Sequence, residues 1–203
     1  MAAPTYRYFL IYKPFGMLSQ FSTEGARSTL ADLPFEFPKD VYPVGRLDAD
    51  SEGLLLLTND NLLNHHLLNP GFRHQRTYFV QVEGTISPDG IAQLQAGVII
   101  QIDGKAHRTL PAKVQLLAEE PPLPERNPPI RFRKNLPTSW ISVALHEGKN
   151  RQVRRMTAAV GFPTLRLVRW TIEAVCLEDM QPSQVREVEK DWVYKQLKIK
   201  SMR

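Results

Sequence analysis

The chain has 203 residues, of which 42% are hydrophobic and 23% charged, and its net charge is +5. These values are typical of a folded protein of one or two domains, and they exclude a disordered chain and a disulfide-stapled miniprotein. The most apolar stretch, residues 54–57, is far shorter than the roughly 20 residues of a membrane span. The single cysteine, Cys176, excludes an internal disulfide and a cysteine-based zinc cluster. Because the N-terminus resembles no signal peptide, we expect a cytoplasmic protein.

Apolar periodicity and the positions of Pro and Gly predict the elements in chain order. Strands are predicted at 6–12, 53–58, 77–82, 98–101, 112–117, 140–145 and 165–175. Helices are predicted at 60–68, where Asp60 is the cap, and at 87–97, 150–160 and 184–199. The segment 119–137 holds six of the 16 prolines, which excludes regular structure.

Single helices are interspersed among these strands instead of alternating strictly with them. We therefore expect an α+β fold with a mixed, largely antiparallel central sheet and flanking helices, in preference to a doubly wound parallel fold. We expect one domain over residues 1–203, and two subdomains within it are the alternative.

Positive charge is concentrated in one part of the chain, the basic zone of residues 126–169. It contains ten Lys or Arg residues and one acidic residue, so it carries a charge of +9 while the remaining residues carry −4. A localised basic zone is typical of proteins that bind a phosphate-rich partner. The alternative is a solvated basic face without a partner. We interpret the cations of the C-terminus as a solvated tail; they are Lys195, Lys198, Lys200 and Arg203.

Three carboxylates, Asp48, Asp50 and Glu52, precede the second predicted strand. They belong to residues 45–60, GRLDADSEGLLLLTND. A carboxylate in a loop beside a buried strand is held rigidly, as a nucleophile or an acid–base group must be. The alternative is an ordinary polar turn, because Asp, Ser and Gly are common turn residues.

A second polar segment, residues 147–156, has the sequence EGKNRQVRRM and overlaps a predicted helix. One arc of this helix would hold Val153, Met156, Thr157 and Val160, and the opposite arc Arg151, Arg154 and Arg155. Arg154 lies at the edge of the cationic arc, from where its guanidinium could pair with a carboxylate or phosphate in an adjoining pocket. The alternative is a solvated helix face, although cations at a helix start oppose the helix dipole.

Both segments resemble motifs of the RsuA-type pseudouridine synthases. Residues 45–60 are similar to the central motif of that family and residues 147–156 to a later motif. Residues 12–16, YKPFG, resemble the N-terminal motif, and residues 76–80, RTYFV, resemble the tyrosine motif. Arg76 and Ser183 depart from the family, since many relatives have Lys and Gly there. Several members carry an N-terminal S4 RNA-binding module, but we expect none here because the first predicted strand begins at residue 6.

The resemblance implies an RNA pseudouridine synthase, an isomerase that converts a uridine of large-subunit (23S) ribosomal RNA to pseudouridine. Such an enzyme flips the target base, breaks the N1–C1′ bond and rejoins the base through C5, without cofactor or metal. Asp48 is the implied nucleophile. It would attack either C1′ of the ribose or C6 of the uracil, and the resemblance does not choose between them. Arg154 would pair with Asp48. At about 4 Å and an effective dielectric near 20, this pair is worth about 4 kcal/mol before desolvation.

The resemblance also assigns roles to residues around the target base. Tyr78 would stack on the base, which is worth about 1–3 kcal/mol against the few kcal/mol that base flipping costs. From the pattern alone, a core residue of a strand is the preferred interpretation of Tyr78. Arg46 would enter the gap that the flipped base leaves, and Leu167 would form the apolar wall of the uracil pocket. The candidate phosphate contacts are Lys13, Arg151 and Arg155. We expect a monomer that associates with no membrane.

Two other functions stay open. An RNA-binding protein without catalytic activity could share the fold, but it would have no need of Asp48, Tyr78 and Arg154 together. A hydrolase could use Asp48 with Asp50 or Glu52, but no aromatic sugar-binding cluster accompanies these carboxylates. The proline-rich segment 119–137 is either a loop that grips RNA or an inert spacer.

Overall fold

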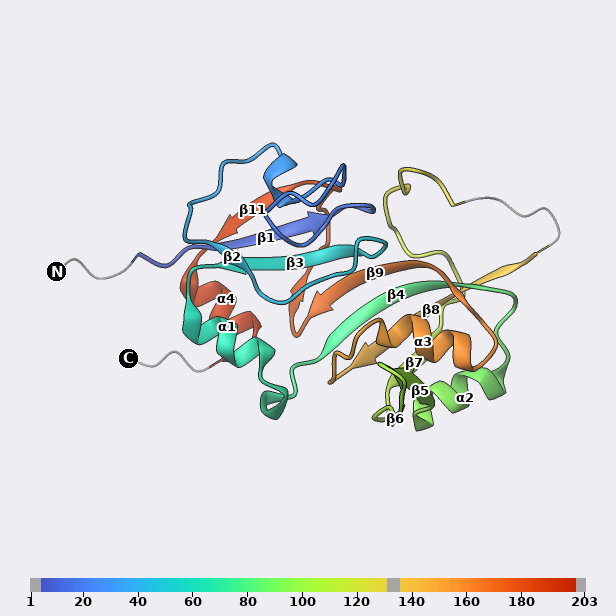
Figure 1. Ribbon diagram of the computed structural model, residues 1–203. Helices are drawn as coiled ribbons and strands as arrows, with labels where there is room; N and C mark the ends of the chain where they lie inside the picture. The colour runs from blue at the N-terminus through green and yellow to red at the C-terminus, as the bar shows by residue number, and fades with distance from the viewer. Residues whose placement is uncertain (1–4, 131–135, 200–203) are drawn as a thin grey trace. The chain divides into compact units, whose positions relative to one another are not determined.

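The computed structural model describes residues 5–130 and 136–199 and divides into two compact units (Figure 1). Unit 1 comprises Met1–His74 and Thr171–Arg203, and unit 2 comprises Gln75–Trp170. Each unit combines helices with antiparallel strand pairs, which confirms the predicted α+β class. Among the described residues, no helix is long and apolar enough to cross a membrane.

Unit 1 is built on three antiparallel strands in the order β11 (Val185–Val188), β1 (Tyr8–Lys13) and β3 (Glu52–Thr58). Every residue of β1 and β3 is buried, because these apolar runs have covering side chains on both faces of the sheet. On one face, Phe9 and Leu55 belong to a cluster formed with the long loop between β1 and β3. That loop contains η1 (Leu30–Asp32) and β2 (Tyr42–Pro43), which pairs with the end of β3.

Asp60 ties three elements of unit 1 together. One oxygen of its carboxylate accepts the N–H groups of Leu62 and Leu63 at 3.0 and 3.3 Å, which starts α1 (Asn61–Leu68) at the predicted place. The other oxygen accepts the hydroxyls of Tyr8 at 2.7 Å and of Tyr194 at 2.6 Å. Tyr8 lies on β1 and Tyr194 on α4 (Lys190–Gln196). The short helix η2 (Pro70–Phe72) follows α1.

The same contacts fix the protonation state of Asp60. Burial alone would raise the pKa of its carboxyl, but the hydrogen bonds from the two tyrosines and the two backbone N–H groups lower it below its ordinary value. Burial, together with the neighbouring carboxylate, raises the pKa of both Tyr8 and Tyr194. The network is therefore a carboxylate held by neutral phenols at neutral pH.

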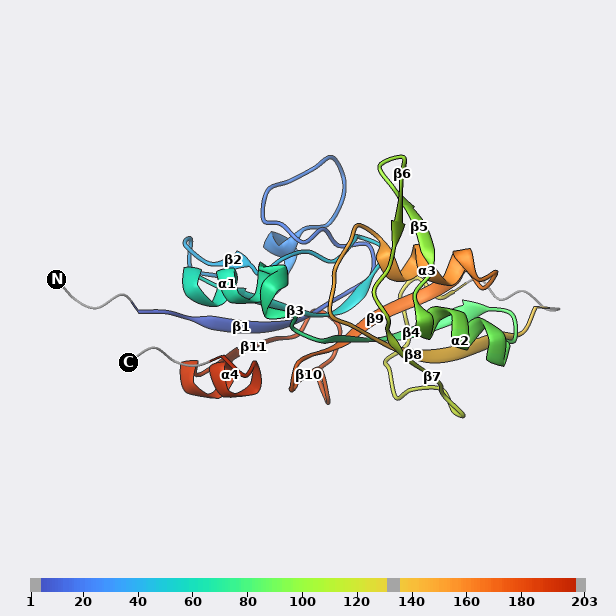
Figure 2. The same ribbon diagram turned by 90° about the horizontal axis from the view of Figure 1, so that it is seen from below.

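Unit 2 contains a sheet in the order β9 (Thr164–Ile172), β4 (Arg76–Glu83), β8 (Thr138–Leu145) and β7 (Lys113–Leu116); the last two residues of β9 belong to unit 1. Buried residues of these strands form one apolar cluster with α2 (Pro88–Ala96) and α3 (Gln152–Ala159). A separate hairpin of β5 (Ile99–Ile102) and β6 (Lys105–Arg108) projects from this unit (Figure 2).

Helix α2 has the start and the end that the sequence predicts. The Ser87 hydroxyl accepts the N–H of Gly90 at 3.1 Å, and Pro88 occupies the first turn. Gly97 ends the helix with φ of +84°, and a Cβ there would lie 2.3 Å from the carbonyl oxygen of Thr109. Only glycine fits this close approach.

Two predicted elements are wrong in part. The strand predicted over 165–175 ends at Ile172, because Glu173 adopts φ of 49° and the chain turns back as β10 (Val175–Cys176), which pairs with the end of β9. The helix predicted over 184–199 is strand β11 followed by α4, because residues 185–188 pair with the edge of β1 that β3 does not occupy. The predictions also omit β6.

The proline-rich segment contains no helix or strand over its described residues, 119–130 and 136–137, as predicted. Residues 131–135 lie outside the described residues, and with them three cations of the basic zone: Arg131, Arg133 and Lys134. Lys200 and Arg203 of the predicted C-terminal tail also lie outside them.

Candidate active site

Asp48 lies in the loop that leads into β3. Its backbone carbonyl accepts the N–H of Ser51 at 3.0 Å, which closes a turn, and its side chain is half-buried. Arg46, two residues earlier, is exposed, whereas Leu47 between them is buried. The loop thus leaves Arg46 accessible to a solvent-borne partner and holds Asp48 at the edge of the core.

The residues on either side of Asp48 are hydrogen bonded to the loop that follows β1. The Ser19 hydroxyl donates to the carbonyl of Leu47 at 2.8 Å and accepts its N–H at 3.0 Å. The N–H of Gly16 donates to the carbonyl of Ala49 at 2.7 Å. The YKPFG motif and the residues after it therefore support the Asp48 loop. Ser19 could not be identified from the sequence, since a lone serine in a loop carries no recognisable signal.

Lys13 does not have the environment of a phosphate contact. Its side chain is 0% exposed. Its ammonium donates to the carbonyl oxygens of Pro14 at 2.9 Å and Met17 at 2.7 Å. The predicted phosphate contact is corrected on this ground: Lys13 braces the loop that supports Asp48.

Tyr78 and Leu167, in unit 2, belong to the same apolar region. Tyr78 lies on β4, is half-buried and packs against the cluster that contains Leu167 of β9 and Val153 and Met156 of α3. Leu167 is 6% exposed. An aromatic ring at the border of an apolar cluster has the setting needed to stack on a planar base.

Arg169 on β9 hydrogen bonds to the side chain of Tyr78. Burial lowers the pKa of its guanidinium, while Tyr78 opposes that effect and Arg76 adds to it. The sequence contained a signal for this contact, since Arg169 stands within a predicted apolar strand. Charge patterning alone assigns Arg169 only to the basic zone.

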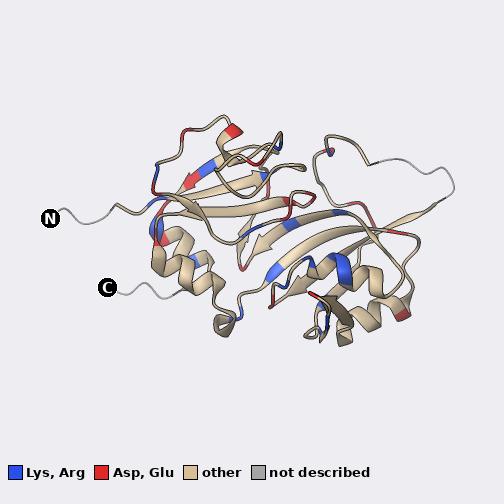
Figure 3. Cartoon of the chain, viewed as in Figure 1, with Lys and Arg blue, Asp and Glu red and all other residues tan. Residues whose placement is uncertain are grey.

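Among the described residues of the basic zone, not every cation is exposed. Arg166 and Arg169 are only 4% and 5% exposed. Arg166 donates to the carbonyl of Pro124 at 2.8 Å and so fastens the proline-rich segment to β9. Of the described cations of the zone, Lys149 and Arg151 are exposed. They belong to the start of α3 and the loop before it, where Figure 3 marks Lys and Arg in blue.

The start of α3 is organised by Glu147. Its Oε1 accepts the amide of Gln152 at 2.6 Å and the backbone N–H of Leu110 at 2.7 Å, and its Oε2 lies 3.4 Å from Nε2 of His107. The helix begins at Gln152, two residues later than predicted, because Arg151 adopts φ of 51°. Lys149 in the preceding loop is exposed.

The predicted arcs of α3 are largely confirmed. Val153, Met156 and Thr157 are buried, whereas Arg154 and Arg155 are half-buried and Arg151 is exposed. Arg155 donates to Oδ1 of Asn150 at 2.9 Å. Val160 lies just beyond the helix as its C-cap.

The predicted site residues are divided between the two units. Unit 1 contains Lys13, Arg46 and Asp48, and unit 2 contains Tyr78, Arg151, Arg154, Arg155 and Leu167. Within unit 2, Tyr78 packs against the cluster that contains Leu167. Within unit 1, the loop that follows Lys13 is hydrogen bonded to the loop of Asp48. The ion pair between Asp48 and Arg154 stays a prediction.

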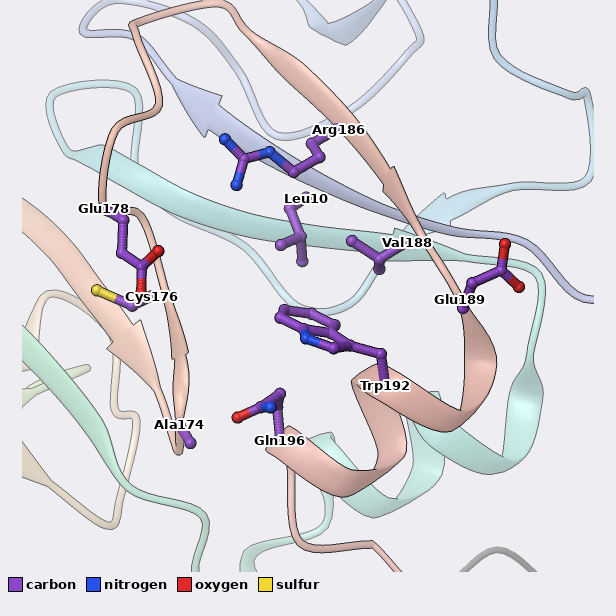
Figure 4. Close-up of a pocket in the computed structure, with 9 residues that line it drawn as sticks. All are labelled: Leu10, Ala174, Cys176, Glu178, Arg186, Val188, Glu189, Trp192 and Gln196. Atoms are coloured by element: carbon purple, nitrogen blue, oxygen red, sulfur yellow. The ribbon is translucent and has the colours of Figure 1, made fainter.

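A cavity of about 520 Å³ in unit 1 is lined by none of these residues (Figure 4). The side chains around it come from β1, β10, β11, α4 and the turns next to them, and the indole of Trp192 lies between them. Two of its lining residues are acidic, Glu178 and Glu189, and its cation Arg186 is paired with Asp179 at 2.9 Å. This excess of negative charge does not suit a nucleic acid.

Comparison with known proteins gives consistent results. The family model described as RNA pseudouridylate synthase matches residues 7–159. Ribosomal large subunit pseudouridine synthase E of Vibrio parahaemolyticus is 48% identical over 184 residues, which cover 90% of this chain and 74% of that protein. The protein of the same name from Xanthomonas campestris is 52% identical, over 87% and 92%. A crystal structure of a pseudouridylate synthase has a TM-score of 0.76 at 25% identity, over 95% of this chain and 74% of that chain.

Proposed function

Because the chain belongs to the RNA pseudouridylate synthase family, we propose that it isomerises a specific uridine of large-subunit ribosomal RNA to pseudouridine. The observation that carries the proposal is the setting of Asp48. A carboxylate stands at the entrance to a fully buried strand, and both of its neighbours in the chain are hydrogen bonded to a second loop. A nucleophile needs such a fixed position.

In the proposed reaction Asp48 attacks either C1′ of the ribose or C6 of the uracil, and the N1–C1′ bond breaks. The base turns within the site, and C5 bonds to C1′. The hydrogen on C5 leaves as a proton, N1 gains a proton, and the carboxylate is released. No electrons are gained or lost overall, so the reaction needs no external oxidant or reductant.

We propose that Arg154 pairs with Asp48 and keeps its carboxylate ionised when the RNA closes over it. Tyr78 stacks on the target base, and its hydrogen bond to Arg169 fixes the orientation of the ring. Leu167, in the cluster against which Tyr78 packs, provides the apolar wall of the uracil pocket.

RNA is held by exposed and half-buried cations of both units. Arg46 enters the gap left by the flipped base, and Arg151 and Arg155 contact phosphates from the start of α3. Lys149, in the same loop as Arg151 and exposed, is suited to the same role. We further propose that residues 1–203 work as one catalytic domain, as a monomer in the cytoplasm, where ribosomes assemble.

The test follows the hydrogen that the reaction must expel. The protein is incubated with large-subunit ribosomal RNA carrying tritium at C5 of uridine, and the label released to water is counted. We expect stoichiometric release by the parent protein and none by Asp48→Asn. This substitution keeps the size of the side chain, so the variant should bind RNA as tightly as the parent. Asp50→Asn, a neighbouring carboxylate of the same loop, is the matched control and should retain activity.

The outcomes separate the remaining alternatives. Release from precursor ribosomal particles but not from naked RNA would identify the particle as the substrate. If the parent binds RNA and releases no label from either substrate, the proposal is wrong and the protein is a binder without catalytic activity.

A further inference from the structure

We infer that Ser19 is a positioning residue for Asp48, and this inference rests on the proposed function. One hydroxyl serves both backbone groups of Leu47: it donates to the carbonyl at 2.8 Å and accepts the N–H at 3.0 Å. Its effect on Leu47 is that of a neighbouring strand, which likewise satisfies the N–H and C=O of one residue. The peptide that leads into Asp48 is thereby fixed.

The second neighbour of Asp48 is fixed from the same loop. The N–H of Gly16 donates to the carbonyl of Ala49 at 2.7 Å. The turn from Asp48 to Ser51 adds a third constraint, through the 3.0 Å bond from the N–H of Ser51. With the backbone held before, at and after Asp48, the carboxylate keeps little more than its side-chain torsions.

Ser19 is itself rigidly placed. It is 3% exposed, and its neighbour Leu18 donates its N–H to the carbonyl of Ser28 at 2.8 Å. Lys13 holds the carbonyl of Met17 at 2.7 Å with a side chain that begins on β1. Lys13 therefore anchors the loop to the sheet, and Ser19 extends that anchorage to the loop of Asp48.

The bonds of Ser19 are local to the site. The sheet of unit 1 is held independently, because β1 and β3 are paired over six residue positions. Beyond Ser19, the Asp48 loop is joined to the sheet by the N–H of Val44, which donates to the carbonyl of Leu56 at 2.8 Å. Removal of the Ser19 hydroxyl should therefore loosen the backbone at Leu47 while the unit stays folded.

The experiment compares Ser19→Ala with Ser19→Thr, which keeps the hydroxyl, and with Ser22→Ala, an exposed serine of the same loop. The single-turnover rate at saturating RNA and the Kd for RNA are measured separately. A displacement of a reacting group by about 1 Å costs up to about 100-fold in rate. We expect Ser19→Ala to lower the rate about 10- to 100-fold with Kd unchanged, Ser19→Thr to restore most of it, and Ser22→Ala to match the parent.

Hydrogen exchange of the Leu47 amide gives a readout that needs no activity. It should be protected in the parent and in Ser22→Ala, and should lose protection in Ser19→Ala. If the parent protein releases no tritium, the proposed function fails. The exchange data still report whether Ser19 holds the backbone of Leu47. A parent-like rate, or equal loss of rate and RNA affinity, in Ser19→Ala overturns the inference.

If Ser19→Ala does not fold, the rate of Ser19→Cys is measured in its place. The thiol has nearly the shape of the hydroxyl but is a weak donor and acceptor. A folded Ser19→Cys with the parent rate would equally overturn the inference.

Discussion

Loss of the buried contact between Tyr194 and Asp60 should destabilise the protein by an amount that the structure allows us to estimate. Both side chains are 2% exposed, and the hydroxyl lies 2.6 Å from the carboxylate. A hydrogen bond to a charged group contributes about 1.5–3 kcal/mol. Tyr194→Phe removes this one bond and leaves the ring in place, so we expect the free energy of unfolding to fall by about 1.5–3 kcal/mol.

Asp60→Ala removes more stabilising interactions than Tyr194→Phe does. It ends the cap of α1, worth about 1 kcal/mol. It also leaves the hydroxyls of Tyr8 and Tyr194 buried without an acceptor, at about 1–3 kcal/mol each. The expected loss is about 3–7 kcal/mol, a large part of the roughly 5–15 kcal/mol that stabilises an ordinary domain.

Urea unfolding followed by circular dichroism measures both changes. For a typical slope of about 2 kcal/mol per molar urea, Tyr194→Phe should move the midpoint by roughly 1 M. Tyr42→Phe is the matched control, since Tyr42 is 64% exposed and should unfold like the parent. A loss below about 0.5 kcal/mol in Tyr194→Phe, or equal losses in the two variants, would refute the reasoning.

The pKa of Asp60 adds a pH dependence to the same experiment. Its pKa in the folded chain is lowered, so its stabilising contribution is fully present above about pH 4, the ordinary range of a carboxyl. That contribution is lost as the pH falls through the lowered folded-state value. The difference in unfolding free energy between the parent and Asp60→Asn should therefore be constant from pH 5 to 7 and shrink below pH 4. A difference that grows in acid would contradict the assignment.

Two further predictions concern the site. Arg169→Met removes the hydrogen bond to Tyr78 and should lower the single-turnover rate about tenfold. Arg166→Met, a buried arginine of the same strand that bonds to Pro124 instead, should leave the rate near that of the parent, and similar losses in both would count against positioning of Tyr78. The affinity for RNA should fall as the salt concentration rises. For each phosphate contact, the logarithm of the binding constant should fall by about 0.7–0.9 per tenfold increase in salt. The double variant Arg151→Gln/Arg155→Gln should reduce this slope by about 1–2, whereas Lys39→Gln, an exposed lysine of unit 1, should not change it.

The elements that the sequence predicted well are those with local chemical signals at their ends. Asp60 and Ser87 mark the starts of α1 and α2 as hydrogen-bond acceptors, and Gly97 marks the end of α2 because only glycine fits there. The C-terminal segment had no such signal. Residues 184–189, QVREVE, suit a helix, and their pairing with β1 is a long-range contact that local patterns do not contain.

In the site, too, some features have a signal in the sequence and others depend on the folded structure. The family resemblance was confirmed by the comparisons. The structure places Tyr78 against the apolar cluster that contains Leu167, and the roles of both residues stay predictions. Burial was the part that charge patterns could not provide. The sequence predicts Lys13 as a phosphate contact and places Arg166 and Arg169 in the basic zone. Each of the three is buried and donates a hydrogen bond to a group of the protein itself.

The burial of Lys13 also makes it a natural reporter of loop opening. Amine-reactive reagents modify the neutral form of a lysine that they can reach, and the ammonium of Lys13 is enclosed by two carbonyl oxygens with no exposed surface. Exposed lysines such as Lys39 and Lys105 should be labelled within the first minutes. Labelling of Lys13, read by peptide mass, should proceed only as fast as the loop between β1 and Ser19 leaves its place. A mass spectrometer could thus time the opening of the loop that supports Asp48, in the parent protein and without a substrate.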